Sequence, residues 1–357
     1  MTVSRILLVR LRQIGDVIFT TPAIRALRQR FPDAHISYIV EPAAAPIVER
    51  NPHLSEVIVA PRRSGVLQLL ADLDLGRRLR SDRYDLAIDF HGGPRAALLT
   101  WLSGAPVRIG YAVPGRGWLY TKRVARARTL RPRHSVENQW DLLAPLGIGP
   151  ADPTAFPVEM PVDEDAIRSV GHRLSAAGVS EHDPILVVHV SAGNPFRRWP
   201  LESFVSLARG LAGRDPSRRI VVTSGPSDED AAARVIAATR DLSSQIVSCG
   251  DFSLVELRAL LERASLYIGG DSGPLHLAAS TAVPIVGLYG PTLPVRSQPW
   301  RGRSHIAEAV DAGTLPCRPC DQRICAPGDF RCLTTIGPER VLEAAERVLA
   351  SAHARRL

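Results

Sequence analysis

The alternation of apolar strand-like runs with amphipathic helix-like runs most constrains what this chain can fold into. The pattern begins with "RILLVRL" at residues 5–11. A glycine turn and a helical pattern follow over residues 13–34, with Ile24, Leu27 and Phe31 on one face. Strands that alternate with helices in this way are typical of a parallel sheet covered by helices. We therefore predict an α/β fold made of doubly wound parallel sheets.

The alternation pauses over residues 147–165, "GIGPADPTAFPVEMPVDED", which are rich in proline, glycine and acidic residues, as linkers are. It restarts at "DPILVVHVSAG" and ends in the helical pattern "PERVLEAAERVLASAHA". The chain has 357 residues, which is also more than one typical core accommodates. We predict two domains, over residues 1–165 and 166–340, followed by a C-terminal helix in residues 341–357.

Basic residues are concentrated in the first half of the chain. Residues 1–150 hold 22 Lys and Arg against 12 Asp and Glu, whereas the remainder holds 22 against 24. A basic half indicates an anionic partner, such as nucleic acid, a phosphorylated glycolipid or an acidic membrane surface. An arginine-rich proteome is the alternative, since Lys122 is the one lysine. The low aromatic content of 5% argues against nucleic acid, which is commonly bound by stacking.

The apolar runs are too short for a membrane-spanning helix, which needs roughly 18 residues. The stretch "MTVSRILLVRLRQIGD" has arginines within its apolar run and no small-residue cleavage site, so it does not resemble a signal peptide. We therefore expect a cytoplasmic protein.

Polar residues gather at four predicted strand-to-helix turns, where open α/β sheets bind ligands. No glycine-rich dinucleotide motif follows the first strand and no Walker A motif is present. "RQIGDV" places Asp16 at the first of these turns, and "TSGPSDED" places Glu229 at the third. A carboxylate at the end of a strand, such as that of Glu229, could accept hydrogen bonds from ribose hydroxyls. Helix capping is the alternative for both carboxylates.

The second and fourth turns carry groups that suit phosphate. "VSAGNPFRRWP" combines Ser191 with Arg197, a pairing that fits phosphate oxygens or, alternatively, a solvated loop. "GGDSGPLHLAAS" opens a helix whose N-terminus could receive a phosphate. A core histidine is the alternative at this turn, but an acid, a hydroxyl, a glycine and a histidine so close together argue against it: Asp271, Ser272, Gly273 and His276.

Four of the five cysteines lie in "CRPCDQRICAPGDFRC", with the spacing C-x2-C-x4-C-x6-C. Disulfides are rare in the cytosol, and four clustered thiolates can form a tetrahedral zinc or iron site. A reduced or partly oxidised loop without metal is the alternative. The candidate ligands are Cys317, Cys320, Cys325 and Cys332.

Taken together, "ILLVRLRQIGDVIFTTPAIRALRQRFPDA", "HVSAGNPFRRWP", "GGDSGPLHLAAS" and "VGLYGPT" resemble the lipopolysaccharide-core heptosyltransferases of glycosyltransferase family 9. The resemblance spans nearly the whole chain in the right order. It implies a GT-B architecture, in which two Rossmann-like domains face each other across a cleft. It also implies that the first domain binds the acceptor, the second binds the ADP-sugar donor, and the C-terminal helix crosses back to the first domain. The cysteine cluster resembles one in heptosyltransferase III-type members.

The resemblance assigns a role to each candidate residue. It implies that Asp16 is the catalytic base, that Ser191 contacts the donor diphosphate and that Glu229 reaches the ribose. Arg197 stands where the family often has a lysine. The arginine keeps the positive charge but presents it with a different geometry. The implied donor motif comprises Asp271, Ser272, Gly273 and His276.

We therefore expect an inverting glycosyltransferase that needs no cofactor for transfer. The expected reaction moves a heptose from ADP-L-glycero-D-manno-heptose to the Kdo- and heptose-containing inner core on lipid A. The expected location is peripheral, at the cytoplasmic face of the inner membrane, with residues 115–134 as a candidate docking stretch. A family member that modifies a protein (an autotransporter, for example) or another glycan is one alternative. A nucleotide-sugar binding protein without turnover is the other.

Overall fold

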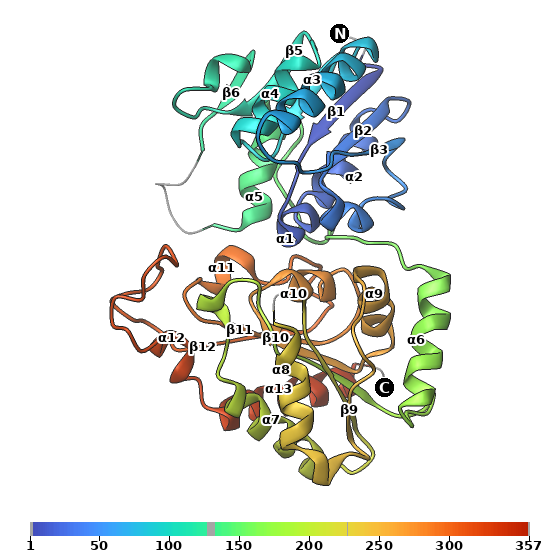
Figure 1. Cartoon of the computed structure of the whole chain (residues 1–357), viewed down its shortest axis with the longest axis vertical. Coiled ribbons are helices and arrows are strands. Elements are labelled where there is room, and N and C mark those ends of the chain that lie inside the picture. The colour runs from blue at the N-terminus through green and yellow to red at the C-terminus, as the bar shows by residue number, and fades with distance from the viewer. Residues whose placement is uncertain (1–2, 127–132, 227, 356–357) are drawn as a thin grey trace. The chain divides into compact units, whose positions relative to one another are not determined.

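The structure is a computed structural model that describes residues 3–126, 133–226 and 228–355, except for the side chain of Glu229 (Figure 1). The chain forms two compact units, residues 1–161 and 162–357. The division falls within residues 147–165, the segment whose composition suggested a linker.

The described part of the first unit contains a parallel six-stranded sheet in the order β3-β2-β1-β4-β5-β6. Its strands are β1 (Arg5–Val9), β2 (His35–Val40), β3 (Glu56–Val59), β4 (Leu86–Asp89), β5 (Val107–Tyr111) and β6 (Lys122–Val124). Its α-helices are α1 (Ile14–Ile18), α2 (Thr21–Arg30), α3 (Gly65–Ser81), α4 (Pro94–Leu102) and α5 (Ser135–Trp140). Short 3-10 helices are η1 (Pro42–Ile47), η2 (Gly117–Leu119) and η3 (Asp141–Leu146).

In its described residues the second unit repeats this arrangement, with a parallel six-stranded sheet in the order β12-β11-β10-β7-β8-β9. Its strands are β7 (Ile185–His189), β8 (Arg219–Thr223), β9 (Ile246–Val247), β10 (Leu266–Gly270), β11 (Ile285–Tyr289) and β12 (Ala307–Asp311). Its α-helices are α6 (Glu164–Ala176), α7 (Leu201–Arg214), α8 (Glu229–Ala238), α9 (Leu254–Arg263), α10 (Gly273–Ala278), α11 (Pro294–Ser297), α12 (Arg331–Thr334) and α13 (Pro338–Ala354). Two 3-10 helices are η4 (Pro195–Arg197) and η5 (Arg240–Leu242).

Both sheets are doubly wound, which confirms the predicted α/β class. In each sheet the first and fourth strands in chain order pair at the centre, β1 with β4 and β7 with β10. Successive strands are added outward from this central pair on both sides. The central strands are short apolar runs buried on both faces, as strands of parallel sheets must be when helices cover them.

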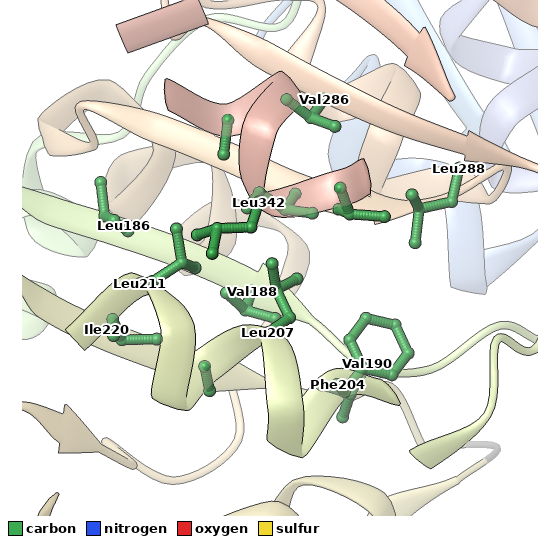
Figure 2. Close-up of a cluster of buried hydrophobic side chains, with 14 of the residues drawn as sticks. Leu186, Val188, Val190, Phe204, Leu207, Leu211, Ile220, Val286, Leu288 and Leu342 are labelled. Carbon is green, nitrogen blue, oxygen red and sulfur yellow. The ribbon is translucent and has the colours of Figure 1, made fainter. Parts of the chain in front are cut away.

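The C-terminal helix α13 belongs to the second unit and packs within it. Its apolar face packs against α7 and the sheet of the second unit, as Figure 2 shows for Leu342 beside Leu211 and Val286. Leu342 fits against Gly210 of α7, where a Cβ atom would lie 2.8 Å from the Cδ2 atom of Leu342. The helix therefore completes the core of the second unit, because its buried stripe has partners there: Val341, Leu342, Ala344, Ala345 and Val348.

Truncating Leu342 should test this placement. We expect Leu342→Ala to lower the free energy of unfolding by about 2–5 kcal/mol, since it removes a buried leucine and leaves a cavity beside α7. Urea unfolding followed by circular dichroism measures the change, with the exposed Ser351→Ala on the same helix as control. Equal stability of the two variants would contradict the packing of α13 in this core.

Candidate active site

The first group of candidate residues lies where β1 and β4 end in the first unit. Asp16 lies in α1, directly after β1, and the carboxylate pairs with the guanidinium of Arg10. Arg10 is itself fixed, because its Nη1 donates a hydrogen bond of 2.6 Å to the carbonyl of Phe90 after β4. The Asp16 side chain keeps 37% of its surface exposed, while Arg10 is nearly buried. The carboxylate is therefore both accessible and held in place.

The turn that carries Asp16 is braced from α5. The Nε2 of Gln139 donates to the main-chain carbonyl of Asp16 at 3.2 Å. The hydroxyl of Thr20 lies 2.8 Å from the same carbonyl and 2.5 Å from the Oε1 of Gln139. Gln139 and Thr20 are both buried, so these contacts limit the movement of α1, which has only 5 residues.

Asp89, the last residue of β4, shapes the adjoining turn. One carboxylate oxygen accepts hydrogen bonds of 2.8 Å from the main-chain N–H groups of His91 and Gly92, and the other accepts one of 2.6 Å from the hydroxyl of Tyr120. Complete burial raises the pKa of Asp89, and these hydrogen bonds oppose the rise. The carboxylate oxygens of Asp89 are thus occupied by hydrogen bonds within the protein, and Asp89 holds the backbone at His91 in place.

His91 is the residue that this turn presents toward Asp16. Burial, followed by the charges of Arg10 and Arg12, lowers the pKa of His91 to about 4, and Asp16 opposes the shift. The imidazole is therefore neutral near pH 7 and can bind a hydroxyl group without adding charge. Neither Arg10 nor His91 was predicted as a site residue, although Arg10 directly follows β1 and His91 lies two residues after β4, positions that could have marked both.

The second group of candidates lies where β7, β8 and β10 end in the second unit. His189 is the last residue of β7 and is buried. Its Nδ1 lies 3.0 Å from the hydroxyl of Thr223, and its Nε2 lies 3.2 Å from the hydroxyl of Ser191. Ser191 also accepts a hydrogen bond of 2.7 Å from the N–H of Gly225. Burial lowers the pKa of His189 to about 4, so a neutral imidazole orients the Ser191 hydroxyl.

Arg197 brings the second and fourth turns together. Its Nη1 donates to the main-chain carbonyl of Asp271 at 2.9 Å and lies 3.2 Å from the Asp271 Oδ2. Its Nε donates to the Oε1 of Gln322 at 2.7 Å. The Nε2 of His276 lies 3.6 Å from the Asp271 Oδ1. The structure therefore gathers Arg197, Asp271 and His276, which the sequence analysis selected from two separate turns.

Several polar atoms in this group are left without an aligned hydrogen bond in the described residues. Both carboxylate oxygens of Asp271 and the hydroxyl of Ser272 are shielded from solvent and lack a hydrogen bond of good geometry. Arg197 and His276 lie near the Asp271 carboxylate but do not meet that geometry. Ser272 occupies the N-cap position of α10 without a side-chain hydrogen bond to the helix, and Gly273 is the first residue of that helix. Buried polar atoms without partners are uncommon in native proteins, so they indicate that a ligand or ordered water completes the group.

Glu229 is the first residue of α8, and its side chain lies outside the described part of the structure. Arg198, the neighbour of Arg197, is held back in its loop, because its Nε donates to the carbonyl of Ala192 and lies 3.3 Å from Asp228.

The four clustered cysteines line one pocket of about 210 Å³, together with aromatic and apolar side chains that include Phe196 and Phe330. Burial raises the pKa of the Cys332 thiol, and the neighbouring thiols add to the rise. Across the described residues, no three His, Cys, Asp or Glu side chains are arranged to hold a metal ion. The four thiols thus have the number and type of a tetrahedral metal site without its converged geometry.

Among residues 3–126, 133–226 and 228–355, no helix has the length and apolar character needed to cross a bilayer.

Known proteins match this chain along most of its length. The sequence model of glycosyltransferase family 9 (heptosyltransferase) matches residues 73–327. Lipopolysaccharide heptosyltransferase 3 of Escherichia coli K12 is 29% identical over 346 residues, which cover 95% of this chain and 96% of that protein. Lipopolysaccharide heptosyltransferase 2 of the same strain is 26% identical over 351 residues, covering 97% and 98%.

Solved structures share the fold. A family 9 glycosyltransferase from Veillonella parvula superposes with a TM-score of 0.83 at 26% identity, covering 98% of each chain. The E. coli heptosyltransferase WaaC with ADP-2-deoxy-2-fluoro heptose gives 0.68 at 22% identity, covering 95% and 99%. TibC, an iron-containing dodecameric glycosyltransferase of enterotoxigenic E. coli, gives 0.57 at 14% identity, covering 100% and 78%.

The family model covers more than half of the chain, and two doubly wound units are the fold that its structural neighbours share. The chain belongs to glycosyltransferase family 9 and is a transferase with the GT-B fold.

Proposed function

We propose that this glycosyltransferase moves a heptose from ADP-L-glycero-D-manno-heptose to a phosphorylated, Kdo- and heptose-containing inner-core saccharide on lipid A. Its relatives are named lipopolysaccharide heptosyltransferases, and WaaC, which shares the fold, was solved with an ADP-heptose analogue. One observation carries the proposal. The accessible Asp16 carboxylate, which pairs with Arg10, lies at the carboxyl end of the strands in the first unit. The Arg197–Asp271 pair and Ser191 lie at the carboxyl end of the strands in the second unit.

Asp16 serves as the general base in this proposal. As the acceptor oxygen attacks the anomeric carbon, the hydroxyl proton passes to the Asp16 carboxylate. The bond between the anomeric carbon and the diphosphate oxygen breaks, and ADP leaves with that electron pair. Attack from the face opposite the diphosphate inverts the anomeric configuration. Arg10 orients the carboxylate, and neutral His91 is placed to hydrogen-bond the acceptor.

The second unit binds the donor. Arg197 neutralises charge on the diphosphate, and the oriented hydroxyl of Ser191 donates to one of its oxygens. Asp271 and His276 lie near the heptose, and the Ser272–Gly273 turn meets the diphosphate. Glu229 reaches the ribose. The side-chain oxygens of Asp271 and Ser272 that lack hydrogen bonds would make them with the bound nucleotide sugar.

The acceptor places the protein at the cytoplasmic face of the inner membrane as a peripheral protein. The uneven charge supports this location, since the basic excess lies in residues 1–150. Residues 127–132 of the basic stretch 115–134, including Arg128 and Arg131, lie outside the described residues. The described part holds Trp118, which is well exposed, and Arg126, which stacks over the ring of Tyr111.

No metal takes part in the transfer we propose. The cysteine pocket is proposed instead as a structural site for zinc or iron, because four thiols line one cavity and would hold an ion if they closed on it from their present positions. When bound, the ion would neutralise thiolate charge and fix the loop. That loop also carries Gln322, which contacts Arg197, so its order bears on the donor group.

Removal of the base should nearly abolish transfer. We expect Asp16→Asn to lower the rate of ADP release by ~100-fold or more while ADP affinity stays close to normal, since the base acts on the acceptor. A coupled assay for ADP measures the rate, and calorimetry measures the affinity. The exposed Asp33→Asn in the same unit is the matched control. More than about a tenth of the rate remaining in Asp16→Asn would contradict a general-base role.

Loss of the Arg197 charge should weaken the donor site. We expect Arg197→Gln to reduce ADP affinity at least about tenfold, because a charge-assisted contact with the diphosphate is lost. Isothermal titration with ADP provides the measurement, and the exposed Arg214→Gln on α7 is the control. If the two variants bound ADP equally well, Arg197 would be a structural partner of Asp271 alone.

The cysteine pocket gives an analytical test. Tag-free protein purified without chelator should contain about one equivalent of zinc or iron, which Cys317→Ser/Cys320→Ser should lose and Cys249→Ser should retain. Elemental analysis of the three proteins decides the matter. Protein that carried no metal, with four titratable thiols in the cluster, would remove the metal from the account.

A further inference from the structure

The N-terminal half of α3 exposes the apolar side chains that a soluble helix normally buries. The exposed fractions are 71% for Val66, 62% for Leu67, 51% for Leu69, 57% for Leu70 and 37% for Leu73. Single exposed leucines are ordinary, but five large apolar residues within eight positions form a continuous surface, which in soluble proteins usually marks an interaction site.

The opposite face of α3 is the one that packs, and it is polar at its centre. Asp72 is 4% exposed, and its Oδ1 lies 2.9 Å from the Arg95 guanidinium of α4. The side chain of Gln68 donates to the same carboxylate at 2.9 Å. Further along, Gly76 fits against the side chain of Leu102 in α4, which lies beside α3 in Figure 1. The helix is thus fixed by an ion pair, a close approach and the packing of Leu75 and Leu79 in the core of the first unit, while the leucines of its N-terminal half are left outside.

The exposed side of α3 changes from apolar to positively charged along the helix. At 100° per residue, Val66, Leu69, Leu70 and Leu73 lie along one line, and Arg77 and Arg80 continue it. Both arginines are exposed, and in the described residues neither pairs with a carboxylate. The stripe is therefore apolar over its first two turns and cationic over its last, with the exposed Arg62 and Arg63 just ahead of the helix.

We propose that this stripe of α3 is the membrane-docking element, which lies in the interface of an anionic bilayer. The leucines would enter the acyl boundary, while the arginines would pair with lipid phosphates. This inference rests on the proposed function in one respect, that the acceptor is lipid-linked. A second copy of the chain fits less well, because a single exposed carboxylate, that of Asp74, adjoins the stripe to meet four arginines of its partner: Arg62, Arg63, Arg77 and Arg80.

An exposed tryptophan pair beside α3 supports a lipid partner independently. Trp101 in α4 and Trp118 in η2 are 44% and 69% exposed, and their ring centroids lie 6.5 Å apart. Trp101 directly precedes Leu102, the residue that packs on Gly76 of α3. Tryptophan is enriched at the level of lipid headgroups, where its ring is half in hydrocarbon and half in water.

Vesicle binding by the full chain tests the proposal. Co-sedimentation would compare vesicles of phosphatidylcholine with vesicles of phosphatidylcholine and phosphatidylglycerol. We expect Leu69→Gln/Leu70→Gln/Leu73→Gln to weaken binding to the anionic vesicles at least about tenfold, because it removes most of the inserted area while keeping helix propensity. Arg77→Gln should weaken binding less and reduce its dependence on salt. Ile167→Gln, at an exposed apolar position of α6, should bind as the unaltered protein does.

Each other outcome overturns the proposal. Undiminished binding of the triple variant to anionic vesicles would exclude α3 as the docking element. A lower unfolding temperature in the triple variant would show that the leucines are covered by the chain itself. A dimer that dissociates in the triple variant, seen by gel filtration, would show that a second copy covers them.

A water-soluble acceptor separates this inference from the proposed function. With a core saccharide freed of its acyl chains, the triple variant should release ADP as fast as the unaltered protein. No ADP release by either protein would count against the proposed function, while the vesicle measurement would still decide the role of α3.

Discussion

The parallel pairing between the first and fourth strands of each sheet determines where chemistry can take place in this protein. Val9 of β1 pairs with Asp89 of β4, and His189 of β7 pairs with Gly269 of β10. The chain leaves these central strands toward opposite sides, so a gap between loops opens at their carboxyl ends. A polar residue placed there is supported by two strands at once, which is a stiffer support than a surface loop gives.

The two units use this support in the same way. In each, a buried titratable residue ends a central strand, and a candidate functional residue follows two positions later: Asp89 precedes His91, and His189 precedes Ser191. The buried residue uses its hydrogen-bonding capacity inside the protein, on turn amides and Tyr120 in one unit and on Thr223 and Ser191 in the other. The shifted pKa values of Asp89 and His189 therefore reflect structural support of the turns, whereas Asp16 and Arg197, which we propose contact substrate, stay partly exposed.

The sequence could predict the fold because strand–helix alternation has a local period and its interruption is local too. It could also select Asp16, Ser191 and Asp271, since each follows an apolar strand. The sequence could not predict contacts between residues far apart in the chain, such as those of Arg197 with Asp271 and of Arg10 with Phe90. The amphipathic pattern of α13 showed that one face is buried but not against which unit. In α3, apolar residues lie on both sides of the helix, so periodicity could not reveal that Asp72 faces inward and Leu70 outward.

The central proposal is that this protein transfers heptose to the inner core of lipopolysaccharide. Mass spectrometry of lipopolysaccharide from a strain that lacks this protein tests that claim most directly. The core should be shorter by a heptose and whatever is built on it, and the unaltered gene should restore it. An unchanged core in the deletion strain, with the protein known to be expressed in its parent, would contradict the account.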